Sequence, residues 1–165
     1  MLKIEKVFCP DGSLEITLIG SVDELSPLDT GVGEVPDLIR VNCREVSRLN
    51  SIGIKIWINY FQELKKKGKQ VIFQECSVPV VFALGMLSNF TAGYPVSSLF
   101  AEYSCEKCTN TFDVLFTVEK LVEIALQLPE MPCKTCSGPA HCSEGPEYLA
   151  FLKDTQRTQL LGSSG

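Results

Sequence analysis

The chain has 165 residues, of which 45% are hydrophobic and 21% are charged, and it carries a formal net charge of -5 at pH 7. These values predict a soluble globular protein of one ordinary domain with an appendage. The net negative charge opposes non-specific binding to nucleic acid and to anionic membrane surfaces. We therefore expect a protein or small-molecule partner, with no nucleic acid and no membrane involved.

The beginning of the chain lacks the apolar core of a secretory signal, and the densest apolar run, residues 78–87, is too short to cross a bilayer. We therefore expect a cytoplasmic protein. In that reducing compartment the eight cysteines are not expected to form a disulfide framework.

The first 50 residues predict mainly β-structure. Residues 3–8 and 13–20 are β-prone and are separated by a Pro-Asp-Gly turn, which predicts a hairpin. Residues 21–37 are polar and contain proline and glycine, which favours a loop with one short helix at most. Residues 38–43 alternate apolar and polar side chains and predict a strand, with strand-like character continuing to Leu49.

The next 50 residues alternate between helices and strands. Apolar residues from Ile52 onward fall on one face of a helix that continues to Lys67. Residues 70–75 predict a strand, Ser77 is placed to cap a helix that continues to about Ser88, and residues 96–103 predict a last strand. This order predicts an α/β fold with a largely parallel or mixed sheet and crossover helices on its faces.

The junction between strand and helix, Asn50-Ser51-Ile52-Gly53, is the first candidate site. A helix start presents unpaired backbone N–H groups and a partial positive charge, which suits an anion, a phosphorylated hydroxyl or a partner's carboxylate. Ser51 is interpreted either as the helix N-cap or as a contact or modification site. Gly53 allows close approach of the helix start to the sheet.

Residues 1 to about 100 resemble the STAS domain, the module shared by anti-sigma-factor antagonists and the cytoplasmic tails of sulfate transporters. The resemblance lies in the element order and in two segments: Ile19-Gly20-Ser21-Val22-Asp23-Glu24 is similar to a strand that ends in a Gly-x-x-Asp-Glu turn, and residues 38–53 are similar to the family's strand followed by Asp-Ser-Ser-Gly. It implies a STAS-like mixed sheet with helices mainly on one face. It also implies a switch in which a partner kinase phosphorylates the serine before the motif's glycine.

This chain departs from the motif, since Ile52 stands at the phosphoacceptor position and Asn50 at the aspartate. The resemblance therefore implies a non-catalytic regulatory module that binds a protein, such as an anti-sigma-type kinase or another regulator, around Asn50 to Gly53, Asp23, Glu24 and the 21–37 loop. If the site switches, Ser51 or a ligand would have to act in place of the usual phosphoserine. The alternative is a STAS module that senses a small anion or nucleotide at the same helix start.

A second candidate site consists of two C-x-x-C pairs, Cys105 with Cys108 and Cys133 with Cys136. Together they offer a tetrahedral set of four thiolates that suits a structural zinc, and iron uses the same set. Ligand sets with His141 or Cys142, and a redox-active dithiol, are the alternatives. The combination resembles bacterial STAS proteins with a zinc-ribbon-like extension.

The predicted organisation is a STAS-like domain over residues 1–104, a zinc-ribbon-like subdomain with four cysteine ligands over 105–142, and a short helix with a frayed tail over 143–165. Cys9, Cys43 and Cys76 are expected to be small core residues. Because no histidine precedes residue 141, no Cys-His pair is available in the first domain, and we expect no enzymatic activity.

Overall fold

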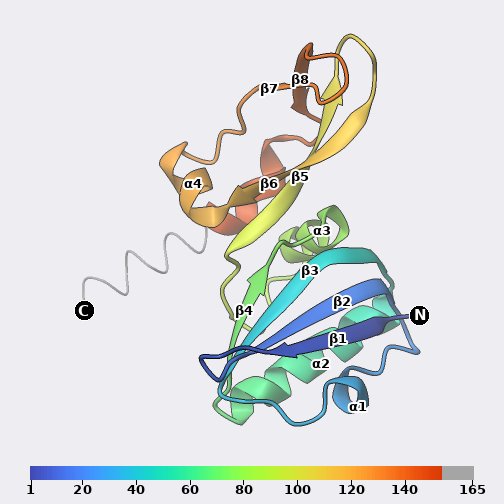
Figure 1. Cartoon of the computed structure of the whole chain (residues 1–165), viewed down its shortest axis with the longest axis vertical. Helices are drawn as coiled ribbons and strands as arrows, with labels where there is room; N and C mark the ends of the chain where they lie inside the picture. Colours follow the sequence, from blue (N-terminus) through green and yellow to red (C-terminus); the bar gives the residue numbers. More distant parts are fainter. Residues whose placement is uncertain (154–165) are drawn as a thin grey trace.

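The computed structural model describes residues 1–153 and shows two four-stranded sheets with several helices, so the predicted α/β class is confirmed (Figure 1). The elements of the first part are β1 (Lys3–Phe8), β2 (Leu14–Val22), α1 (Leu28–Val32), β3 (Leu38–Leu49), α2 (Ser51–Lys66), β4 (Gln70–Gln74) and α3 (Val78–Met86). The elements of the second part are β5 (Ser98–Cys105), β6 (Thr111–Thr117), α4 (Val118–Glu123), β7 (Met131–Pro132), β8 (Pro139–Cys142) and the 3-10 helix η1 (Pro146–Leu149).

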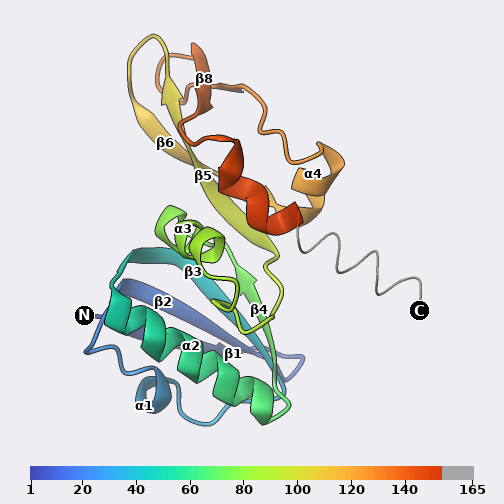
Figure 2. The same ribbon diagram turned by 180° about the vertical axis from the view of Figure 1, so that it is seen from behind.

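The first sheet is mixed and has the strand order β1-β2-β3-β4. β1 and β2 form the expected antiparallel hairpin, while β2, β3 and β4 run parallel to one another. Helices α1, α2 and α3 lie on the same side of this sheet in both views (Figures 1 and 2). One face of the sheet therefore carries the core and the other faces away from the helices.

The alternation of side chains explains this one-sided arrangement. Along β2, the residues Leu14, Ile16 and Leu18 are buried and the residues between them are half-buried. Helix α2 turns an aromatic face to the sheet, and Trp57 stacks between Phe73 of β4 and Phe90, at centroid distances of 5.6 and 5.0 Å. Aromatic side chains bury large apolar areas, so this cluster fixes α2 against the sheet.

Strand β5 differs from its prediction as the last strand of the first sheet. It pairs along its length with β6 and also with β8, in a second sheet of order β6-β5-β8-β7. With β4 and the residues just after it, residues 96–99 form two isolated parallel bridges, Phe73 with Val96 and Cys76 with Leu99, and no ladder. The alternating pattern identified a strand, but the partner strands follow later in the chain. The predicted boundary after residue 104 stays a prediction.

The two parts of the molecule share one core near β5. The Tyr148 hydroxyl donates to the Phe100 carbonyl at 2.6 Å, and the Tyr148 ring meets Phe82 of α3 edge to face. From the first sheet, the Arg44 guanidinium lies 5.1 Å from the centroid of the Phe100 ring. The short helix predicted after residue 143 thus packs at the junction between α3 and β5.

Two further predictions concern membrane-spanning helices and the end of the chain. No helix within residues 1–153 is long and apolar enough to cross a membrane. The frayed tail predicted for the end of the chain lies, from residue 154 onward, outside the described residues.

Candidate functional site

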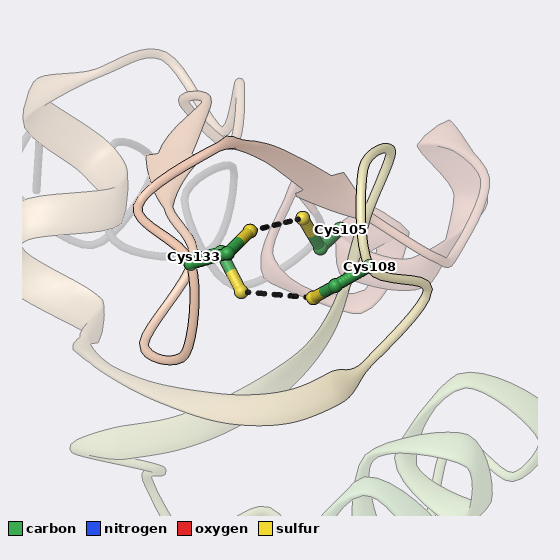
Figure 3. Close-up of side chains that lie close together, drawn as sticks. Cys105, Cys108 and Cys133 are labelled. Carbon is green, nitrogen blue, oxygen red and sulfur yellow. Dashed lines mark hydrogen bonds between the residues drawn. The ribbon is translucent and has the colours of Figure 1, made fainter.

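The structure brings the two predicted cysteine pairs together at one end of the second sheet. The ligand atoms of Cys105, Cys108, Cys133 and Cys136 all lie within 4.8 Å of one another. Across the pairs, the Sγ atoms of Cys105 and Cys136 are 3.5 Å apart, and those of Cys108 and Cys133 are 3.6 Å apart (Figure 3). The four thiols therefore form one cluster, which could hold a metal ion.

The two pairs have the same backbone geometry. In the first, the amide of Cys105 donates to the Asn110 carbonyl and the amide of Lys107 to the Cys105 sulfur; in the second, Cys133 donates to Gly138 and Thr135 to the Cys133 sulfur. Each loop then turns through a residue with positive φ, Thr109 at 63° and Ser137 at 63°. Two equivalent knuckles thus face one another.

These distances fit a tetrahedral metal site. Metal–sulfur bonds of about 2.3 Å in a tetrahedron place neighbouring sulfurs about 3.8 Å apart, close to the separations across the pairs. The amide N–H groups that point at Cys105 and Cys133 stabilise thiolates, which are the form that binds metal. With four protein ligands there is no open coordination position, as is typical of a structural site.

The thiols of the cluster have different proton affinities. Backbone N–H groups of Cys136 and Thr135 lower the pKa of Cys133 to about 6, and the N–H groups of Cys108 and Lys107 lower the pKa of Cys105. At Cys108 the Asn110 N–H acts to lower the pKa, but burial and the neighbouring thiols together outweigh it and raise the pKa of Cys108 to about 12. The Cys133 thiol is therefore much more acidic than the Cys108 thiol.

His141 and Cys142 are not part of this cluster. The His141 Nε2 atom lies 3.0 Å from a Glu106 carboxylate oxygen and 3.6 Å from one of Glu130. The Cys142 sulfur accepts the Glu144 N–H at 3.4 Å, and burial raises its pKa. The four paired cysteines are thus the ligand set that the geometry favours.

The other cysteines lie outside the cluster. Cys43 and Cys76 are fully buried, as expected of core residues, whereas Cys9 is only half-buried in the β1–β2 turn. Burial, together with the neighbouring Cys76 thiol, raises the pKa of Cys43 well above its ordinary value. The Cys43 thiol is therefore protonated at neutral pH.

The strand-to-helix junction is capped by a different residue from the one predicted. The Asn50 side-chain oxygen accepts the Gly53 N–H at 2.7 Å, so Asn50 is the N-cap of α2. Ser51 is the first helical residue, and its hydroxyl has no hydrogen-bond partner within residues 1–153. The interpretation of Ser51 as the cap is therefore wrong, because an N-cap needs extended backbone, which Asn50 has with φ −102° and ψ 172°.

Gly53 is placed against the end of β2. A Cβ atom at this position would lie 2.1 Å from the Val22 carbonyl oxygen and 2.6 Å from the Asp23 amide nitrogen. These are backbone atoms, which cannot move aside without shifting the strand. The glycine is thus required by the packing of the helix start, as expected.

The loop after β2 lies beside the helix start. The Asn50 amide donates to a Glu24 carboxylate oxygen at 2.8 Å, and this contributes, after the local backbone N–H, to a lowered pKa of Glu24. Asp23 accepts the Leu25 N–H at 3.0 Å and the Ser21 hydroxyl at 3.0 Å, which lower its pKa in that order. Both carboxylates are therefore ionised and held in place.

Two apolar side chains point outward from this framework. Ile52 is 54% exposed on the first turn of α2, and Leu25 is 69% exposed on the loop. The hydrogen bond between their neighbours Asn50 and Glu24 keeps the two segments together. We call the six predicted residues, Asp23, Glu24 and Asn50 to Gly53, together with Leu25, the helix-start surface.

Sequence reasoning missed Leu25. Its position in a polar loop gave no periodic signal, and its place beside the helix start depends on the contact between Glu24 and Asn50, which are 26 residues apart.

Neither the scan against protein-family models nor the search of curated proteins finds a match to this chain.

Proposed function

We propose that the chain is a non-catalytic regulatory module that binds a protein through the helix-start surface. The observation that carries this proposal is the exposure of Ile52 and Leu25 on two segments that are fixed to one another. Isolated exposed apolar residues are common on proteins, but two of them on segments joined by a side-chain hydrogen bond, beside ordered carboxylates, offer an apolar anchor with a polar rim.

The order of elements in the first part supports a STAS-like identity for residues 1 to about 100. A hairpin, a parallel extension of the sheet and helices on one side match what the resemblance implies. In that family the helix start is the recognition site. Here Ile52 replaces the phosphoacceptor, so we propose that recognition depends on apolar contact and is not switched by phosphate at this position.

For the cysteine cluster we propose a structural zinc. Four cysteines in tetrahedral arrangement are typical of zinc, and iron is the alternative for the same thiolates. The second part is small, and its strands β7 and β8 have only two and four residues, so metal binding would add to the stability of its core. In this role the zinc holds the subdomain together and, with four cysteine ligands, leaves no coordination position for a substrate.

The alternative, a small-anion or nucleotide sensor, has less support at this surface. The start of α2 favours an anion, but the ionised carboxylates of Asp23 and Glu24 lie beside it. An anion would meet like charge at close range. A saturable rise of the melting temperature with inorganic phosphate or ATP would favour the sensor over the protein-binding module.

The test of protein binding compares three forms of the full chain as baits in the native cell: the unmodified chain, Ile52→Asp and the matched control Val122→Asp. Val122 is 44% exposed on α4 in the second part, so both changes place a carboxylate on an exposed apolar position of a helix. We expect a protein that is retained by the unmodified and control baits and lost by Ile52→Asp. A protein retained equally by all three baits, with unchanged melting temperatures, would reject the surface.

A further inference from the structure

Strand β1 forms an open edge of the first sheet. It is the terminal strand of the order β1-β2-β3-β4, and within residues 1–153 no strand pairs with its outer side. Five of its six residues are exposed, including Val7 at 62% and Phe8 at 67%. Such an edge presents unpaired N–H and C=O groups to another strand.

The other edges of the two sheets are less suited to pair with a copy of themselves. The outer side of β4 meets Val96 and the segment just after β4 meets Leu99, and β7 has only two residues. Strand β6 is open, but its sequence TFDVLFT carries one charge, Asp113, with no cation to oppose it. Strand β1 carries both signs, and the side chains of Lys3 and Glu5 lie 2.6 Å apart on the same strand.

We propose that two copies of this chain associate through their β1 strands, antiparallel and related by a two-fold axis at Ile4, to form a continuous eight-stranded sheet. A two-fold axis perpendicular to the sheet keeps each face of one copy level with the same face of the other. Two directly opposed residues must then point to the same face of the sheet. Because side chains alternate between the faces along a strand, the residue numbers of such a pair add up to an even number. Ile4 opposite Ile4 of the second copy fulfils this condition.

In this register the exposed groups are complementary. Lys3 of each copy lies opposite Glu5 of the other, so two ion pairs flank the axis. Val7 lies opposite Met1 of the second copy, and these two exposed apolar side chains, at 62% and 86%, cover one another. Lys6 is held on the helix side, where its Nζ donates to the Val32 carbonyl at 2.9 Å.

Neighbouring registers are opposed by charge. Moving the axis by one residue towards the start of the chain places Lys3 opposite Lys3 of the second copy. Moving it by one residue in the other direction places Glu5 opposite Glu5 of the second copy. Like charges directly opposite one another are destabilising. The charge pattern of β1 therefore favours the Ile4 register over its two neighbouring registers.

The contact is small, because a strand of six residues extends about 20 Å. We therefore expect a dimer that forms reversibly as concentration rises. The measurement is the molar mass of the full chain by sedimentation equilibrium over a concentration series, for the unmodified chain, Lys3→Glu, Glu5→Lys and the double variant that combines both changes. Either single reversal sets like charges opposite one another, whereas the double reversal restores the opposite charges.

The control is Lys66→Glu, which reverses one charge of the exposed Lys66–Glu63 pair on α2. We expect a monomer–dimer equilibrium for the unmodified chain, the control and the double variant, and a dimerisation constant at least tenfold weaker for each single variant. A monomer at every soluble concentration of the unmodified chain would overturn the proposal. A dimer that is equally strong in both single variants would place the contact elsewhere and would also overturn it.

Discussion

The side chain of Asn50 joins the start of helix α2 to Glu24 in the loop after β2. Its oxygen accepts the Gly53 N–H at 2.7 Å, and its amide donates to the Glu24 carboxylate at 2.8 Å. One side chain thus closes the first turn of the helix and positions the loop that carries Leu25. The shape of the proposed binding surface depends on this pair.

The first prediction concerns the cap of α2. Asn50→Ala removes the cap and the contact to Glu24, so we expect the free energy of unfolding to fall by about 1 kcal/mol. Ser51→Ala removes a hydroxyl that has no partner within residues 1–153, and we expect a change below about 0.5 kcal/mol. Urea denaturation of both variants measures the difference, and an equal loss in both would contradict Asn50 as the cap.

The second prediction concerns Gly53. Gly53→Ala drives a methyl group into the Val22 carbonyl, so we expect a loss of stability of about 1–3 kcal/mol or more. Gly85 lies in helix α3, and a Cβ there meets nothing within 4 Å. Gly85→Ala should therefore stabilise the protein by about 0.5–1 kcal/mol. Thermal melting of the pair checks both signs, and a stabilising Gly53→Ala would refute the close approach.

The third prediction concerns the metal. The unmodified chain should purify with one zinc, and the Cys133→Ser, Cys136→Ser double variant should lose it, because only two thiolates remain. Cys142→Ser and His141→Ala should keep the metal, since neither residue lies in the cluster. Elemental analysis of the purified proteins distinguishes them. Full retention by the double variant would show that other residues bind the metal, and iron in the unmodified chain would correct the choice of metal.

The fourth prediction concerns the reactivity of the metal-free thiols. The thiolate is the nucleophile, so a thiol with a pKa of about 6 is mostly reactive at pH 7, while one with a pKa of about 12 is almost wholly protonated. After chelation, iodoacetamide should therefore modify Cys133 before Cys108, and the Cys133 rate should fall as the pH drops below about 6. Peptide mapping by mass spectrometry gives the order, and earlier modification of Cys108 would contradict it.

Much of this structure was predictable because the signals are local. The turn after Phe8, the apolar face that carries Trp57 and the spacing of the two cysteine pairs each specify geometry within one short segment. The partners of β5 were not predictable in this way, because alternation identifies a strand but not its neighbours, and β8 begins only at Pro139, far along the chain from the end of β5 at Cys105.

The helix-start surface was predictable only in part. The motif located residues 50–53, but Asn50 and Ser51 are both acceptable caps in sequence, and backbone conformation decided between them. The exposure of Leu25 follows from the Asp23 turn and the Glu24 contact, which exist only in the folded chain.

The central claim is that an apolar contact at Ile52, and not a phosphate, carries recognition. The most direct test is the dissociation constant of the protein identified with the three baits, measured by calorimetry for the unmodified chain, Ile52→Ala, Ser51→Asp and Val122→Ala. We expect Ile52→Ala to weaken binding by about tenfold or more, as the loss of a buried anchor does. Ser51→Asp and Val122→Ala should bind as the unmodified chain does. Unchanged affinity for Ile52→Ala, or a large change for Ser51→Asp alone, would contradict the claim.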